Sequence, residues 1–295
     1  MENLILKPIS YRALKNGQWA LLADGSEFLV IEKNTLKEIL AFIEKKEELN
    51  DELVKLLTDE GFTTEEANYL ETVIEEGKST NWKLLHIILY TTGVVSISSL
   101  LVSLIFIGIQ NPINVIPLNV SALITIPFAI LFLLISAGIH ELMHVIYGRT
   151  YNKVGSISLK VRKATATVSL THVWLWSLKS RLAALSAGLV WDFLLLAILM
   201  QVQVFFNHWA LSLSGYLLWV RVFWQFRFHK NSDGRLIAMN LIDNPLIEED
   251  SKDEQKNNND VVLWKKLKII GYLIEGLVLV LLVLPFIGIF VRWLT

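Results

Sequence analysis

The chain contains no cysteine. Disulfide bonds and thiolate metal ligands are therefore excluded, and any transition metal has to be bound by histidine and carboxylate side chains. Charge is missing as well: residues 84–139 include no Asp, Glu, Lys or Arg. About 20 such residues can cross the hydrocarbon core of a bilayer, so this stretch can hold two membrane-spanning helices. With 53% hydrophobic residues and a mean hydropathy of +0.48, the chain is too apolar for an ordinary soluble protein.

Acidic residues are scarce in the middle of the chain. Residues 1–76 carry 17 acidic and 8 basic residues, residues 77–242 carry 3 and 13, and residues 243–295 carry 8 and 6. The acidic first part predicts a soluble module. A basic excess beside apolar spans is typical of cytoplasmic loops under the positive-inside rule, and it requires no nucleic-acid partner. Because the N-terminus has no basic-then-apolar run, we expect residues 1 to about 80 to stay in the cytoplasm.

Apolar runs predict five membrane spans. They lie at about 84–109, 123–148, 182–206, 210–226 and 267–293. The links 110–121 and 207–209 carry no charge, whereas basic residues gather at the opposite ends of the spans: Lys78, Lys83, Arg149, Lys153, Lys160, Arg162, Lys163, Lys179, Arg181, Arg227, Lys230 and Arg235. The asymmetry predicts a multi-pass protein of the cell membrane with a cytoplasmic N-terminus and an external C-terminus.

The soluble module, residues 1–80, is expected to combine a β-hairpin with three helices. Segments 19–22 and 28–31 flank an Asp24-Gly25 turn signal. Helix starts are indicated by the capping boxes that begin at Thr35 and Thr63, and by Asn50. The predicted module is a small α+β domain.

Residues 81–246 are expected to form a core of four spans with an interfacial β-hairpin at about 154–176. Segments 156–161 and 165–170 alternate with period two around a basic turn. Residues 247–295 are predicted to form a polar loop and a final transmembrane helix. The predicted fold class is therefore mainly α, a polytopic membrane helix bundle with a small α+β domain in front.

A metal-binding pattern lies near the end of the second span, where residues 140–144 read His-Glu-Leu-Met-His. On a helix, His140 and His144 lie one turn apart on one face, so both imidazoles can bind one Zn²⁺. Glu141 lies beside them and can accept a proton from water activated at the metal. At 1.5 Å per residue, His140 lies roughly 13 Å from the basic boundary at Arg149. Ionisable groups inside a span indicate function.

A hydrolytic zinc site needs a third protein ligand and an open fourth position. Between residues 77 and 242 the carboxylates are Glu141, Asp192 and Asp233, and Glu275 is the other acidic residue in a span. Asp233 is favoured because it lies at the cytoplasmic end of the fourth span, and Gly234 after it allows the backbone to bend toward the metal. Asp192 and Glu275 can reach a comparable depth and remain alternatives, as ligands or as substrate-holding groups. The other histidines, His86, His172, His208 and His229, are expected in loops or at the membrane interface.

These elements resemble the site-2 protease superfamily of intramembrane zinc metalloproteases, and more narrowly a bacterial branch of peptide zinc metalloproteases. The resemblance covers about residues 84–246: the His-Glu-x-x-His motif, a following hairpin, Arg181 opening a span with Ala187-Gly188, and Asp233-Gly234. It implies that His140, His144 and Asp233 bind zinc and that Glu141 is the general base. The family's Gly-Pro-x-x-Asn is replaced here by residues 188–192, Gly-Leu-Val-Trp-Asp, and the Asn and Pro usual before Asp-Gly are missing. The N-terminal module resembles a PqqD-like winged helix, which implies recognition of a leader peptide.

The expected function is hydrolysis of a peptide or transmembrane-segment substrate near the cytoplasmic face of the bilayer, with Zn²⁺ as cofactor. Its substrate would be a ribosomally made precursor peptide, with an unwound segment paired to an edge of the 156–170 hairpin. The alternative is a non-catalytic membrane protein that serves peptide export or immunity.

Overall fold

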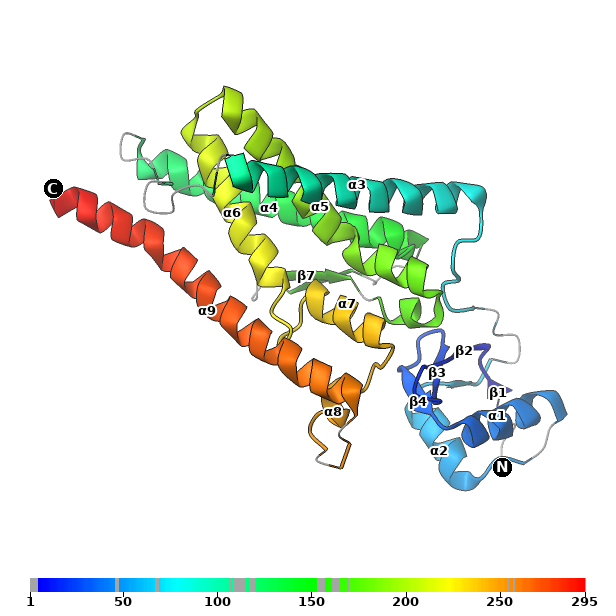
Figure 1. Ribbon diagram of the computed structural model, residues 1–295. Coiled ribbons are helices and arrows are strands. Elements are labelled where there is room, and N and C mark those ends of the chain that lie inside the picture. The colour runs from blue at the N-terminus through cyan, green and yellow to red at the C-terminus, as the bar shows by residue number, and fades with distance from the viewer. Residues whose placement is uncertain are drawn as a thin grey trace. The chain divides into compact units, whose positions relative to one another are not determined.

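The computed structural model describes residues 5–45, 48–66, 69, 71–106, 108, 115–116, 120–152, 157–160, 165–168, 170–253, 255–256 and 258–294. These residues are mainly helical and include small antiparallel sheets (Figure 1). The chain divides into two units. Unit 1 consists of Met1–Gly77, Leu170–Arg181 and Asn240–Pro245, and unit 2 consists of Lys78–Ser169, Leu182–Met239 and Leu246–Thr295.

The sheet of unit 1 is an antiparallel meander of β2 (Ile9–Ala13), β3 (Trp19–Ala23) and β4 (Leu29–Ile31). The predicted hairpin is confirmed, since Trp19 pairs with Ile31 and the chain turns at Asp24-Gly25. Gly25 has a φ of +68°, a left-handed conformation that glycine adopts without strain. Strand β2 is an addition that the sequence patterns did not predict.

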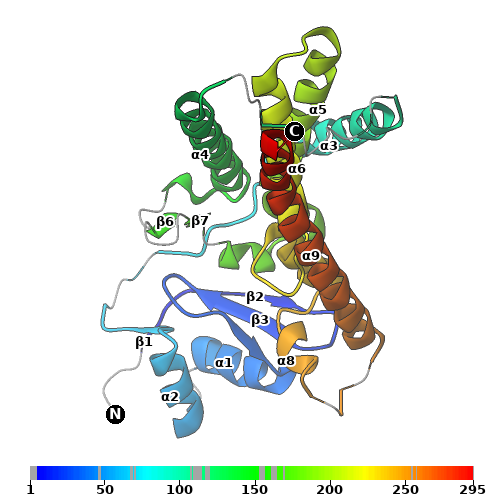
Figure 2. The same cartoon turned by 90° about the vertical axis from the view of Figure 1, so that its left-hand side faces the viewer.

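Helices α1 (Lys33–Lys45) and α2 (Asp51–Asp59) pack their apolar faces with the sheet into one core (Figure 2). Asn50 caps α2 as expected, because its side chain accepts a hydrogen bond from Glu52 N at 3.1 Å. The third predicted helix is wrong: Thr63–Thr64 forms strand β5, which pairs with β1 (Ile5–Leu6), and the described residues from 65 to 78 contain no helix. A local capping pattern is overridden here by strand pairing.

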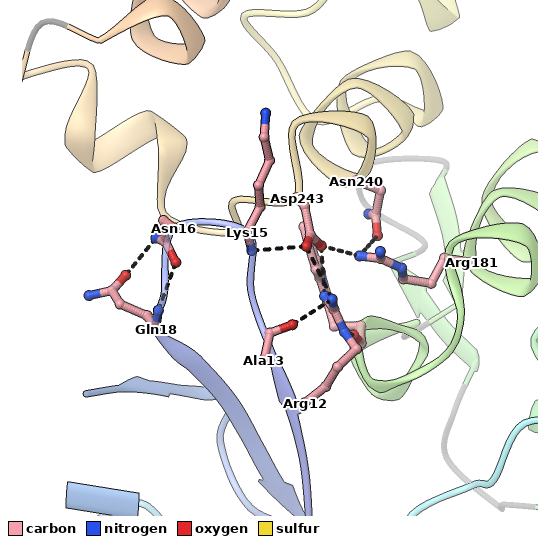
Figure 3. A network of polar contacts seen from close by, with 9 residues as sticks. Arg12, Ala13, Lys15, Asn16, Gln18, Arg181, Asn240 and Asp243 are labelled. Carbon is pink, nitrogen blue, oxygen red and sulfur yellow. Dashed lines mark hydrogen bonds and ion pairs between the residues drawn. The ribbon is translucent and has the colours of Figure 1, made fainter. Parts of the chain in front are cut away.

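Unit 1 also takes in two later stretches of the chain. The 3₁₀ helix η3 (Thr171–Leu175) joins it through Trp174, whose carbonyl accepts from Arg12 Nε at 2.7 Å. Asp243 is the centre of a second junction (Figure 3). Its carboxylate accepts from two nitrogens of Arg12, at 2.8 and 3.2 Å, from Arg181 Nη1 at 2.6 Å and from Lys15 N at 3.1 Å. Burial alone would raise the pKa of Asp243, but hydrogen bonds from the two guanidinium groups outweigh it and lower that pKa.

Among the described residues, four helices are long and apolar enough to cross a membrane, which indicates a membrane protein. They are α3 (Thr80–Phe106), α4 (Ala122–Tyr147), α5 (Leu178–Phe205) and α9 (Asn259–Leu294). They correspond to the first, second, third and fifth of the predicted spans.

The fourth predicted span forms helix α6 (Trp209–Gln225), which has 17 residues. Its length of about 25 Å falls short of a hydrocarbon core of about 30 Å. It lies among the other helices of unit 2 and is largely buried: Leu218 packs with α3 and α5 residues, and Val220 packs with Val278 of α9. Figures 1 and 2 both show α6 beside α9. Helix α6 is therefore an inner element, and a count of five spans stays a prediction.

The predicted second hairpin is confirmed. Strands β6 (Ile157–Lys160) and β7 (Thr165–Val168) are antiparallel, and β7 lies against α4. Lys153, Arg162 and Lys163 of the predicted basic flanks lie outside the described residues. The remaining elements are the 3₁₀ helix η1 (Thr150–Asn152), α7 (Asp233–Ile242) and the short α8 (Ile247–Asp250).

Candidate metal centre

Helix α4 presents His140 and His144 one turn apart, on the same face. The helix forms over a run of almost entirely apolar residues, and Ser121 caps it by accepting a hydrogen bond from Leu123 N at 3.2 Å. Both imidazoles are buried, with 3% and 4% of each residue exposed. A buried pair of this kind needs polar partners on both ring nitrogens.

Asp233 is the first residue of α7, and its carboxylate approaches both histidines. The glycine after it is required by packing. A Cβ on Gly234 would lie 2.5 Å from the carbonyl oxygen of Gln225 at the end of α6, so a side chain there would push α7 away. The reason differs from the backbone bend expected from the sequence, because Gly234 is not among the residues with a left-handed backbone.

The three donor atoms form a compact triangle. His140 Nε2 lies 2.9 Å from Asp233 Oδ2, while His144 Nε2 lies 3.3 Å from the same oxygen and 3.3 Å from His140 Nε2. Zinc bonds of about 2.0–2.1 Å in tetrahedral geometry place two donor atoms about 3.3–3.4 Å apart. The group therefore lies close enough to hold a metal ion, and its nitrogen and oxygen donors suit zinc. Three protein ligands would leave a fourth position open.

The charge state of Asp233 agrees with this role. Burial alone would raise its pKa, but the neighbouring imidazoles of His144 and His140 hold that pKa well below its usual range. The side chain is therefore a carboxylate, the form that binds a metal ion.

One face of α5 supports the back of both imidazoles. His144 Nδ1 donates to the carbonyl oxygen of Ala184 at 2.8 Å, and His140 Nδ1 donates to Asp192 Oδ2 at 2.9 Å. Between them, a Cβ on Gly188 would lie 2.5–2.7 Å from three atoms of the His140 ring. Ala184, Gly188 and Asp192 are spaced four residues apart, so they share one helix face. This spacing of four residues is a signal for the supporting face that is already present in the sequence.

Glu141 follows the first histidine and is half-buried. Its carboxyl group interacts electrostatically with His144, His140 and Asp233. Arg221 of α6 is part of the same electrostatic set. The sequence analysis assigned this arginine no place in the site.

Glu275 of α9 lies apart from this group in the structure. Its carboxylate accepts from His229 Nε2 at 2.7 Å and from Lys230 Nζ, and it lies 3.6 Å from Arg227 Nη1. These three bases belong to the segment directly before Asp233. The position indicates that Glu275 holds this segment on α9.

The remaining histidines also lie elsewhere. His86 stacks with Trp82 and Tyr147, His172 packs against Trp176, and His208 caps α6 by accepting from Ala210 N at 3.3 Å.

Comparisons with protein-family models, with curated proteins and with solved structures found no match for this chain. A function is therefore inferred from the geometry of the site and from the helices that carry its residues.

Proposed function

We propose that this chain is a zinc-dependent intramembrane peptidase of the site-2 protease type. The observation that carries the proposal is the triangle of His140 Nε2, His144 Nε2 and Asp233 Oδ2 at zinc-donor spacing, with Glu141 beside it. Two of these ligands lie on α4, a helix long and apolar enough to cross a membrane. Burying such groups in an apolar helix is energetically costly, so their presence there indicates a function.

Each residue has a distinct role in the proposed reaction. A zinc ion supplies Lewis acidity, which activates water and polarises a carbonyl group. Glu141 accepts the proton of the attacking water and then donates it to the leaving amine of the cleaved peptide bond. The α5 face keeps each Nδ1 occupied, so that both Nε2 atoms are directed to the metal.

The proposed substrate is a peptide or a transmembrane segment, cleaved near the cytoplasmic face of the cell membrane. A helical substrate hides its carbonyl groups in its own hydrogen bonds, so it has to unwind first. The β6–β7 hairpin lies against α4 and, as a two-stranded sheet, can accept an extended segment as a further strand. The proposed substrate is a ribosomally made precursor peptide whose leader is bound by the N-terminal module.

The proposal is tested with Glu141→Gln, which keeps the size of the side chain and removes the general base. The variant should bind zinc like the wild-type protein and lose about 10²- to 10⁴-fold in cleavage rate. Mass spectrometry of peptides that accumulate in cells expressing the variant, but not in cells expressing the wild type, identifies the substrate. Gln201→Leu on α5 is the control: this side chain contacts Ser103 of α3, remote from the metal group, and its loss should leave cleavage unchanged.

If the Glu141→Gln variant still processed the peptide at the wild-type rate, the proposal that this chain is a peptidase would be contradicted. A protein that binds zinc and supports peptide export or immunity equally well with this substitution would be the non-catalytic membrane protein instead.

A further inference from the structure

A chain of polar contacts crosses three helices behind His140. Asp192 Oδ2 on α5 accepts from His140 Nδ1 at 2.9 Å, and Asp192 Oδ1 lies 3.0 Å from Arg221 Nη2 on α6. Arg221 Nη1 donates to Ser136 Oγ on α4 at 2.8 Å. Ser136 precedes His140 by one helical turn, so the contacts leave α4, pass through α6 and α5, and return to α4.

Asp192 reaches His140 from the side of the ring that faces away from the other ligands. Its partner is Nδ1, whereas Nε2 faces His144 and Asp233. A single imidazole cannot offer both nitrogens to one metal ion. In this geometry Asp192 is therefore an outer partner, a residue that contacts a metal ligand without binding the metal. The geometry disfavours the alternative in which Asp192 binds the metal itself.

The charge of Asp192 is a costly feature in this location. The side chain is fully buried, and burying a carboxylate without a partner of opposite charge is unfavourable. Arg221, with 13% of its side chain exposed, supplies the compensating charge. An Asn at position 192 could accept the same hydrogen bond without needing an arginine in the helix, so the pair is explained by what the negative charge does to His140.

We propose that Asp192 and Arg221 are positioning residues that hold His140 as a metal ligand and strengthen its bond to the metal. The carboxylate fixes Nδ1 as the protonated nitrogen and makes Nε2 a stronger electron donor. Arg221 holds the other carboxylate oxygen of Asp192 in place through the 3.0 Å contact between Nη2 and Oδ1. This inference deepens the proposed function and rests on its metal site, but it does not depend on proteolysis.

The test is zinc affinity, measured on purified protein by competition with a chromophoric chelator. Asp192→Asn should weaken zinc binding by about 10- to 100-fold, the usual effect of removing an outer partner of a ligand. Because this variant leaves Arg221 buried without its carboxylate, the double variant Asp192→Asn with Arg221→Met is measured as well. Removing one partner of a buried ion pair is destabilising because it leaves the other charge uncompensated, and the double variant leaves no such charge. The double variant should therefore unfold like the wild type and still bind zinc about 10- to 100-fold more weakly.

A cobalt-substituted sample gives a second readout. The visible absorption of bound Co²⁺ reports ligand identity and geometry, and we expect the bands to shift in the double variant and to stay unchanged in the control Gln201→Leu, which alters the same helix. If the double variant folds, binds zinc with wild-type affinity and shows the wild-type cobalt spectrum, the positioning role is refuted.

The two proposals fail separately. If the wild type binds zinc but cleaves no peptide, the peptidase proposal is refuted, while weakened binding in the double variant still supports the role of Asp192. If cleavage depends on Glu141 but substitution of Asp192 leaves zinc affinity unchanged, the positioning role of Asp192 is refuted and the peptidase proposal is supported.

Discussion

The metal centre depends on the absence of a side chain at Gly188, and Gly188→Ala measures that dependence. The added Cβ would lie 2.5 Å from Nε2, 2.6 Å from Cδ2 and 2.7 Å from Cε1 of His140. Favourable contacts between non-bonded heavy atoms lie at about 3.5–4.0 Å, so the ring has to move by about 1 Å. Metal sites tolerate deviations of only about 0.2 Å in their bond lengths. We therefore expect zinc affinity to fall by at least about 100-fold, the upper end of what an outer partner alone contributes.

The fold should survive this substitution. Alanine is favoured over glycine in a helix by about 1 kcal/mol, which offsets much of an overpacking penalty of about 1–3 kcal/mol. The matched control is Gly138→Ala on α4, two residues before His140, where a Cβ would meet nothing within 4 Å. Zinc affinity is measured by chelator competition and folding by thermal unfolding. If Gly188→Ala binds zinc as tightly as Gly138→Ala, then His140 is not held against α5 as described.

Two further predictions concern α7 and unit 1. Gly234→Ala would place a Cβ 2.5 Å from a backbone carbonyl oxygen of α6, so α7 must shift and carry Asp233 with it. We expect zinc affinity to fall at least about 10-fold, and an unchanged zinc content at limiting zinc would contradict this packing argument. Asp243→Asn should lower the free energy of unfolding of the protein by about 1.5–3 kcal/mol, because it removes a charged acceptor of several hydrogen bonds. Asn tolerates the φ of 61° at this position. Since the pKa of Asp243 is lowered in the folded state, its contribution is complete above the unfolded value of about 3.9 and is lost as the pH falls through the folded value. Unfolding curves of the wild type should therefore converge on those of Asp243→Asn in acid, and a constant difference between them would exclude this linkage.

The local parts of the structure could be predicted from the sequence. The Asp24-Gly25 turn and its flanking strands, the Asn50 cap and the spacing of His140 and His144 are each encoded within a few residues. Glycine geometry, side-chain capping and helix periodicity act over that range, so a pattern in the sequence is sufficient.

The parts that depend on distant residues could not be predicted in this way. Thr63 begins a sequence that favours a helix cap, but pairing with Leu6 makes it a strand residue. Nothing within a few residues of Arg221 indicates its role, because its partner Asp192 lies on another helix. The close approach of α6 that requires a glycine at position 234 is a property of tertiary packing, which the Asp-Gly pair in the sequence does not reveal.

Unit 1 also imposes an order on biosynthesis. Its first stretch ends at Gly77, and its last, Asn240–Pro245, leaves the ribosome only after the chain of α3, α4, α5 and α6 has been made. At about 5–20 residues per second, roughly 10–30 s separate the two events. Throughout that interval Arg12 has no Asp243 to bind, so the completed network marks a chain whose first three long apolar helices have already been synthesised.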